Sequence, residues 1–169
     1  MRYRILTLLF ALMFLNQNLS AGPLEIGAKI PAVEAMLDSG QLIDLSGLVE
    51  KEYVLVYFYP KANTPGCTKQ ACSLRDAYEV LVEKGVTVLG VSKDSLNAQS
   101  SFKEKYELPF SLIADFKSKV IDSFGVHKKL GFSSRQAFLF KNGKLVWRDL
   151  AASTSKQAED VLSFLEESE

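Results

Sequence analysis

The residues most informative about the structure of this 169-residue chain are Tyr53-Val-Leu-Val-Tyr-Phe-Tyr59, followed directly by Pro60-Lys-Ala-Asn-Thr-Pro-Gly-Cys67-Thr-Lys-Gln-Ala-Cys72. The first run is continuously apolar and rich in β-branched and aromatic residues, which is typical of a strand buried on both faces. The second run begins a helix, because Thr64 is a favourable N-cap and Pro65 suits the first helical position. A strand that turns directly into a helix indicates an α/β fold.

The only two cysteines of the chain, Cys67 and Cys72, both lie in this predicted helix. Cys67 falls in the first turn, where unpaired N–H groups and the positive end of the helix dipole stabilise an anion. The thiolate is the nucleophilic form of cysteine. Gly66 beside it lets another atom approach the backbone closely. This placement favours redox chemistry.

The spacing of the two cysteines separates a catalytic pair from a structural disulfide. Positions i and i+5 of an ideal helix are about 140° apart around the axis and about 7.5 Å apart along it. Their Cα atoms would be roughly 8–9 Å apart, beyond the ~7 Å that a disulfide tolerates. A bond between Cys67 and Cys72 therefore requires the helix to unwind. If the protein is exported, as residues 1–21 indicate below, a permanent disulfide would be the common state of its two cysteines. The helix geometry favours a catalytic pair instead.

At these residues the sequence resembles the peroxiredoxins, and within them the peroxiredoxin Q group, also called the bacterioferritin comigratory protein type. The family pattern Pro-x-x-x-Thr-x-x-Cys is met by Pro60, Thr64 and Cys67. The group's Thr-Pro-Gly-Cys-Thr, with a second cysteine five positions on, is met up to Cys72. The similarity runs from about Leu24 to the C-terminus.

The resemblance implies a thioredoxin-like α/β fold with a central mixed β-sheet flanked by helices, and a thiol peroxidase that reduces hydrogen peroxide and organic hydroperoxides. It implies that Cys67 becomes a sulfenic acid, which Cys72 resolves as an intramolecular disulfide. Pro60 would shield the thiolate, Thr64 would position the peroxide, and Arg135, just before a late strand, would stabilise the thiolate. The implied partners are a peroxide and a thioredoxin-like reductant protein, and the implied state is a monomer.

Two positions near the predicted arginine differ from the family pattern. An acidic residue is common three positions after the first cysteine, where this chain has Gln70. Ser or Thr usually follows the arginine, where this chain has Gln136. Both changes bear on how Arg135 is held, whereas the residues that the chemistry needs are all present.

Residues 1–21 have the pattern of a secretory signal peptide. Met1-Arg-Tyr-Arg4 is basic, residues 5–15 form an apolar run too short to span a bilayer comfortably, and Leu19-Ser-Ala21 offers small residues for cleavage. We therefore expect cleavage after Ala21, a single domain over residues 22–169, no stable membrane association after cleavage, and a periplasmic or secreted location. An uncleaved membrane anchor is the alternative.

Composition limits the partners. The 20 basic and 20 acidic side chains become 18 and 20 once Arg2 and Arg4 are removed, which gives a formal charge of −2. No basic patch with interleaved aromatic residues is present, so nucleic acid is not expected as a partner. The single histidine, His127, and the two cysteines do not form a convincing zinc site, and no metal or cofactor is predicted.

Hydrophobic periodicity and turn residues predict the remaining elements. The expected strands are residues 54–59, 86–91 and 110–114, with a terminal hairpin of residues 136–140 and 145–148. The expected helices are residues 65–83, 95–106, 117–124 and one that begins near Thr154. A short hairpin around residues 38–40 and a helical turn over residues 46–50 precede them. Asp115, after a strand end, is expected to cap a helix.

Two other functions fit part of this pattern. An exported thioredoxin-like dithiol/disulfide oxidoreductase would also use a cysteine pair at a helix start, but such enzymes use Cys-x-x-Cys, whereas four residues separate Cys67 from Cys72. A disulfide-stapled binding module would have cysteines whose replacement lowers stability rather than activity.

Overall fold

A five-stranded mixed β-sheet forms the centre of the molecule in the computed structural model, which describes residues 22–168. Its strand order is β5-β4-β3-β8-β9. The bounds are β3 Tyr53–Phe58, β4 Val86–Ser92, β5 Ser111–Ala114, β8 Gln136–Lys141 and β9 Lys144–Asp149. β3, β4 and β5 are parallel, whereas β8 is antiparallel to β3 and β9 is antiparallel to β8. The predicted mixed sheet is therefore confirmed, and the predicted signal peptide lies outside the described residues.

The central strand β3 explains why its sequence is continuously apolar. Its side chains alternate between two hydrophobic clusters, one on each face of the sheet. Leu55 and Tyr57 belong to the first cluster, and Val56 and Phe58 belong to the second. Both faces of the sheet are thus buried, as the unbroken apolar run predicts.

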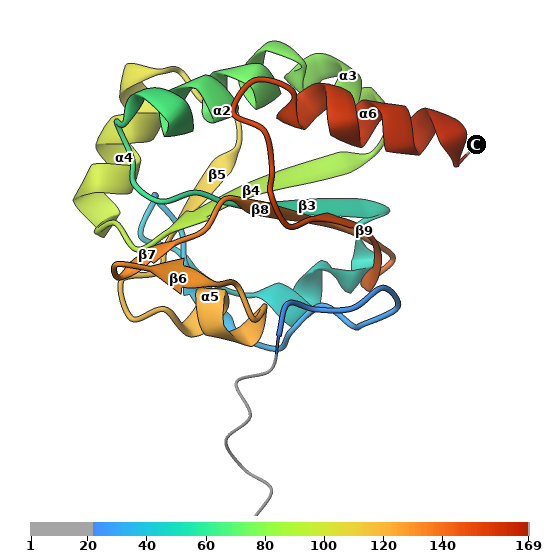
Figure 1. Ribbon diagram of the computed structural model, residues 1–169, viewed down its shortest axis with the longest axis horizontal. Helices are drawn as coiled ribbons and strands as arrows, with labels where there is room; N and C mark the ends of the chain where they lie inside the picture. The colour runs from blue at the N-terminus through green and yellow to red at the C-terminus, as the bar shows by residue number, and fades with distance from the viewer. Residues whose placement is uncertain (1–21, 169) are drawn as a thin grey trace, which may run out of the picture.

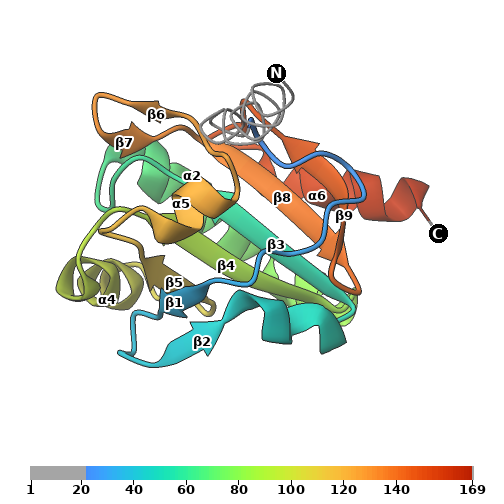
Figure 2. The ribbon, with the colours of Figure 1, turned by 90° about the horizontal axis from the view of Figure 1, so that it is seen from below.

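Helices cover the two faces unequally (Figures 1 and 2). The first face carries four α-helices: α2 Pro65–Asp76, α3 Tyr78–Glu83, α4 Leu96–Lys105 and α6 Gln157–Glu167. The opposite face carries the short elements: β1 Glu34–Met36, β2 Leu42–Asp44, the 3-10 helix η1 Leu45–Glu50 and α5 Lys119–Ser123. None of the helices in residues 22–168 is long and apolar enough to cross a bilayer.

Most predicted elements are present within two residues of their predicted bounds, but two helix predictions are wrong. The helix expected over residues 65–83 is two helices, because Ala77 leaves helical geometry between α2 and α3. The C-terminal helix begins at Gln157 rather than near Thr154. The hydroxyl of Ser153 accepts hydrogen bonds from the N–H groups of Ser155 and Lys156, which holds this segment in a turn.

One small hairpin was not predicted. β6 Lys128–Lys129 and β7 Phe132–Ser133 pair antiparallel through a two-residue turn. Leu130 and Gly131 in that turn both have positive φ, of 52° and 82°. Such a turn is signalled by Asn-Gly or Asp-Gly, and leucine is unusual in this conformation. The sequence therefore lacks the ordinary signal for the hairpin.

Candidate active site

The register of two antiparallel strands brings the predicted site residues together. β8 pairs with β3 so that Gln136 lies opposite Phe58. Arg135, one residue before β8, therefore lies at the end of β3 where the chain leaves the sheet for α2. The positions 135 and 67 are thus neighbours in space although 68 residues separate them in the sequence.

The start of α2 differs from its prediction in one hydrogen bond. Thr64 occupies the N-cap position, with φ −87° and ψ 150°, and Pro65 follows as the first helical residue. The Thr64 hydroxyl does not cap the helix; it donates a hydrogen bond of 2.9 Å to the carbonyl oxygen of Lys61. This bond closes the loop that Pro60 begins, and it leaves the first N–H groups of α2 without a side-chain acceptor from Thr64.

Cys67 and Arg135 are in direct contact. The Cys67 side chain is 2% exposed, and Nη2 of Arg135 lies 3.5 Å from its sulfur. A Cβ atom added to Gly66 would lie 3.3 Å from the same Nη2. The glycine before the cysteine therefore leaves room for the guanidinium beside the sulfur, in agreement with the close approach expected at Gly66.

Gln70 binds the second terminal nitrogen of the Arg135 guanidinium. Nη1 of Arg135 donates a hydrogen bond to Oε1 of Gln70, which is fully buried. A polar partner for the arginine is thus retained at the position that departs from the family pattern, but it is neutral rather than acidic. The second departure, Gln136, is buried, and its Oε1 has no hydrogen-bond partner among the residues that the structure describes.

Two hydrogen bonds that sequence reasoning missed fix the loop around Pro60. The Ser133 hydroxyl donates 2.7 Å to the carbonyl oxygen of Tyr59, directly before the proline. The N–H of Ala62, two residues after it, donates 2.7 Å to Oδ2 of Asp94. No local pattern reveals either bond, because the partners are 74 and 32 residues apart.

Two buried tyrosines, Tyr57 of β3 and Tyr59 directly after this strand, lie on the face of the sheet that α2 covers. Their rings stack with centroids 5.5 Å apart, and they share a hydrophobic cluster with Cys67. Burial raises the pKa of Tyr57 and that of Tyr59 far above the ordinary value, so both phenols remain neutral. The Tyr59 hydroxyl donates to Oε1 of Gln99. The Cys67 site therefore packs against two uncharged aromatic side chains, Tyr57 and Tyr59.

Cys72 lies one and a half turns further along α2. It is half-buried, and both cysteines are free thiols. The helix is continuous through both residues, so the predicted geometry holds: the pair cannot form a disulfide unless α2 unwinds.

Two other candidate residues have structural positions. The N–H of Ile121 donates 2.8 Å to Oδ2 of Asp115, so this carboxylate caps α5 as predicted. His127 is exposed, and its carbonyl oxygen accepts from the N–H of Ser134. Within residues 22–168, no group of three His, Cys, Asp or Glu side chains is arranged to hold a metal ion.

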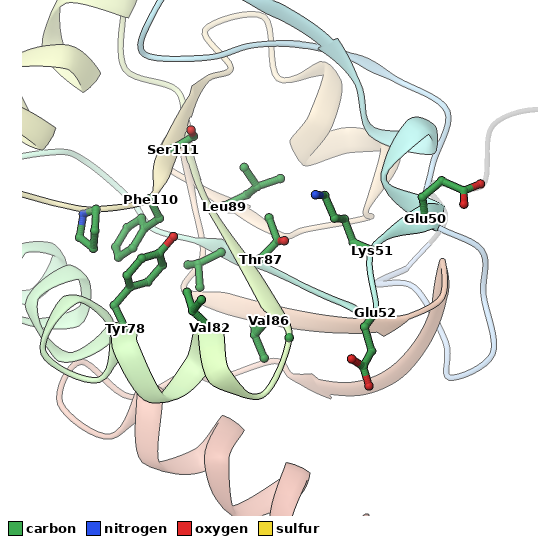
Figure 3. A pocket seen from close by; sticks show the side chains of 13 residues that line it. Glu50, Lys51, Glu52, Tyr78, Val82, Val86, Thr87, Leu89, Phe110 and Ser111 are labelled. Carbon is green, nitrogen blue, oxygen red and sulfur yellow. The ribbon is translucent and has the colours of Figure 1, made fainter.

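A groove of about 500 Å³ lies at the opposite end of the sheet. Figure 3 shows Tyr78 and Phe110 side by side at one end of it, with Lys51 and Glu52 toward the other. It is lined by the first residues of β4, whereas Cys67 follows the last residues of β3. The groove contains none of the predicted site residues, so it is separate from the cysteine site.

Fold and site together define a thioredoxin-like protein with a buried thiol beside an arginine at the start of a helix. Residues 26–148 match the AhpC/TSA family. The Bacillus subtilis protein "Peroxiredoxin Bcp" is 42% identical over 135 residues, which cover 74% of this chain and 85% of that one. The Suaeda salsa protein "Peroxiredoxin Q, chloroplastic" is 37% identical over 145 residues, which cover 83% and 67%.

Solved structures agree with the sequence relatives. The Xylella fastidiosa protein PrxQ superimposes with a TM-score of 0.80 at 25% identity, over 88% of this chain and 99% of that one. Mycobacterium tuberculosis BcpB superimposes with a TM-score of 0.78 at 29% identity, over 85% and 97%. The chain therefore belongs to the AhpC/TSA family, as a thiol peroxidase of the peroxiredoxin Q, or bacterioferritin comigratory protein, subgroup.

Proposed function

We propose that the chain reduces hydrogen peroxide and organic hydroperoxides at Cys67, with Cys72 as the resolving thiol and a thioredoxin-like protein as the electron donor. The observation that carries this proposal is the contact between the buried Cys67 sulfur and Nη2 of Arg135, 3.5 Å away at the start of a helix. The Arg135 guanidinium lies where its donors can interact with negative charge on the sulfur and on a peroxide bound beside it.

In the first step the Cys67 thiolate attacks one peroxide oxygen. An S–O bond forms and the O–O bond breaks, so the sulfur is oxidised to a sulfenic acid. The second peroxide oxygen takes up a proton and leaves as water or an alcohol. Negative charge moves from the sulfur to the leaving oxygen, and donors fixed in that direction lower the barrier. Arg135 supplies such donors, Thr64 is close enough in sequence to orient the peroxide, and half-buried Pro60 limits access by water.

In the second step the Cys72 thiol attacks the sulfenic sulfur. An S–S bond forms, the S–O bond breaks and water leaves. Because both cysteines lie in the continuous helix α2, the residues between them must leave helical geometry for the sulfurs to meet. Unwinding of α2 is thus a conformational step that resolution of the sulfenic acid requires.

In the third step a dithiol donor returns the enzyme to its starting state. Its thiolate attacks the Cys67–Cys72 disulfide to give a mixed disulfide, and its second thiol then releases the reduced enzyme. Cys72 is the more exposed of the two cysteines in the reduced state, which supports attack from the solvent side of α2.

The test of this function follows free thiols when the reduced protein meets one equivalent of hydrogen peroxide. We expect both thiols to disappear together, much faster than free cysteine reacts, and the reaction to be abolished in Cys67→Ser. Loss no faster than for free cysteine would exclude peroxide as the substrate and favour disulfide exchange with other proteins. Retention of the oxidised pair under mild reductant would instead favour a structural disulfide.

We also propose that the protein is exported, because residues 1–21 carry a basic start, a short apolar run and small residues before Gly22. Export would place the disulfide cycle in an oxidising compartment, so its reductant would have to be supplied there. The N-terminal residue of protein isolated from producing cells tests this proposal. Gly22 is expected, whereas Met1 on protein in the cytosolic fraction would contradict it.

A further inference from the structure

Two buried glutamines continue the contact between Cys67 and Arg135 across two helices. Gln70 lies on α2 and Gln157 is the first residue of α6, and both are 0% exposed. Nε2 of Gln70 donates a hydrogen bond of 2.8 Å to Oε1 of Gln157. Because Oε1 of Gln70 accepts from Arg135, the hydrogen-bond chain runs from the active-site arginine to the C-terminal helix.

The donors of Arg135 determine which way the Gln70 amide must face. A guanidinium has only donors, so Gln70 must offer it the carbonyl oxygen. The amide nitrogen then points away from the arginine and needs an acceptor of its own, because an unpaired buried donor is costly. Oε1 of Gln157 is that acceptor. A carboxylate at position 70 would have no such need, so the requirement arises from the glutamine of this chain.

Stability alone does not account for Gln157. Its own Nε2 is buried and has no hydrogen-bond partner among residues 22–168. A half-paired buried amide stabilises a fold less than a well-packed apolar side chain of similar size. The bond that Gln157 does make is the one that orients Gln70.

The start of α6 has further contacts with the helix that carries the cysteines. The N–H of Ala158 donates 3.3 Å to the hydroxyl of Ser73 on α2. Cγ2 of Thr154 lies 3.3 Å from the position that a Cβ of residue 66 would occupy. The segment around the start of α6 therefore contacts α2 at these residues as well as through the Gln70–Gln157 bond.

We propose that Gln157 is a positioning residue for the peroxidase reaction. It accepts from Gln70, fixes the Gln70 carbonyl toward Arg135, and thereby holds the Arg135 guanidinium against the Cys67 sulfur. This role rests on the proposed function of Cys67 and Arg135. Because both amides are neutral, the chain adds no negative charge near the sulfur, and Arg135 has no carboxylate partner in it to compete with the thiolate.

The test uses Gln157→Met, which keeps the length of the side chain and removes its amide, with Gln157→Leu as a second variant that must behave alike. Two rates are measured: oxidation of Cys67 by hydrogen peroxide, and alkylation of Cys67 by iodoacetamide as a function of pH in a Cys72→Ser background. Val161→Ala is the matched control, because Val161 is fully buried on α6 and belongs to its apolar contacts. It weakens the packing of α6 and leaves the amide of Gln157 in place.

We expect Gln157→Met to slow Cys67 oxidation roughly tenfold, as a small misplacement of a charge-stabilising group does, and to move the alkylation profile toward higher pH. Val161→Ala should change neither rate, although it lowers the melting temperature at least as much. In a double-mutant cycle, Gln157→Met should have no further effect once Gln70 is replaced by methionine. Wild-type rates in Gln157→Met, equal slowing in Val161→Ala, or an effect that persists without Gln70 would each overturn the proposal.

The alkylation profile keeps this proposal separate from the peroxidase function. If the wild-type protein failed to react rapidly with peroxide, the proposed function would fail. The shift of the alkylation profile in Gln157→Met would still report whether Gln157 positions Arg135 against the sulfur, because alkylation needs no peroxide.

Discussion

Gly66 and Arg135 approach each other so closely that a Cβ atom on residue 66 would lie 3.3 Å from Nη2 of the arginine. A contact at that distance forces the guanidinium to retreat by a few tenths of an ångström. The same Nη2 contacts the Cys67 sulfur, so any retreat weakens the interaction with the reacting atom.

Gly66→Ala should therefore separate activity from stability. Alanine favours a helix over glycine by up to about 1 kcal/mol, so the free energy of unfolding should stay the same or rise. The rate of Cys67 oxidation should fall several-fold, roughly three- to tenfold, because the arginine is displaced. Gly47→Ala is the control, since a Cβ there meets no atom within 4 Å. Unchanged peroxide kinetics in Gly66→Ala would show that the guanidinium contact does not control the rate.

Arg135→Ala should cost far more activity than stability. Removal of a fixed donor that stabilises developing charge typically lowers the rate by about 10²- to 10³-fold, and we expect a loss of that size in single-turnover peroxide reduction. Arg75→Ala is the matched control. Arg75 lies on α2, the helix that carries Cys67, but its guanidinium contacts Asp76 and the carbonyl oxygen of Tyr106. Equal losses in the two variants would contradict the assignment of Arg135.

Cys72→Ser should react once with peroxide and then stop. Its Cys67 sulfenic acid has no resolving thiol, so a sulfenic-acid probe should label it after one equivalent of peroxide, and excess peroxide should convert it to the sulfinic acid. Mass spectrometry of the labelled protein measures both species. Sustained turnover with the same dithiol reductant would show that another group resolves Cys67.

Asp115 should affect the pH dependence of stability but not peroxide reduction. Burial raises the pKa of this carboxyl above its ordinary value, partly offset by the N–H of Ile121 and its neighbours. The folded state therefore keeps the proton to higher pH than the unfolded chain, and the free energy of unfolding falls as pH rises through that window.

Asp115→Asn keeps an acceptor for Ile121 and removes this titration. We expect its free energy of unfolding, relative to wild type, to improve between pH 4 and pH 7 in urea titrations, because only the wild type pays the cost of a buried charge at neutral pH. Peroxide kinetics should match wild type. A difference that is constant with pH would refute the titration, and slowed kinetics would give Asp115 a role in the site.

The local sequence was enough to predict the sheet and the start of α2. The apolar run in β3 and the Asn142-Gly143 turn between β8 and β9 act over a few residues, and both elements form as predicted. Arg135 could be placed only through the family resemblance, because the register between β3 and β8 decides what it contacts.

Features that depend on tertiary contacts escaped prediction for a physical reason. Residues around Ala77 favour helix, yet the chain breaks there, where Arg75 binds the carbonyl of Tyr106 and Tyr78 packs on Phe110. Gln157 is a single polar residue at a helix start, and nothing nearby in sequence shows that it faces Gln70 across 87 positions.

The break at Ala77 has a consequence for how a reducing partner would find its target. α2 ends after 12 residues, and α3 begins a separate helix whose Leu81 is fully buried in the core. Formation of the proposed disulfide would melt α2 alone, while the sheet and α3 keep their packing. Oxidation would thus make the α2 segment more mobile, and faster amide exchange or proteolysis of this segment could detect it. A donor protein could then distinguish the oxidised from the reduced enzyme by the unfolded α2 segment, without any change in the surface residues elsewhere.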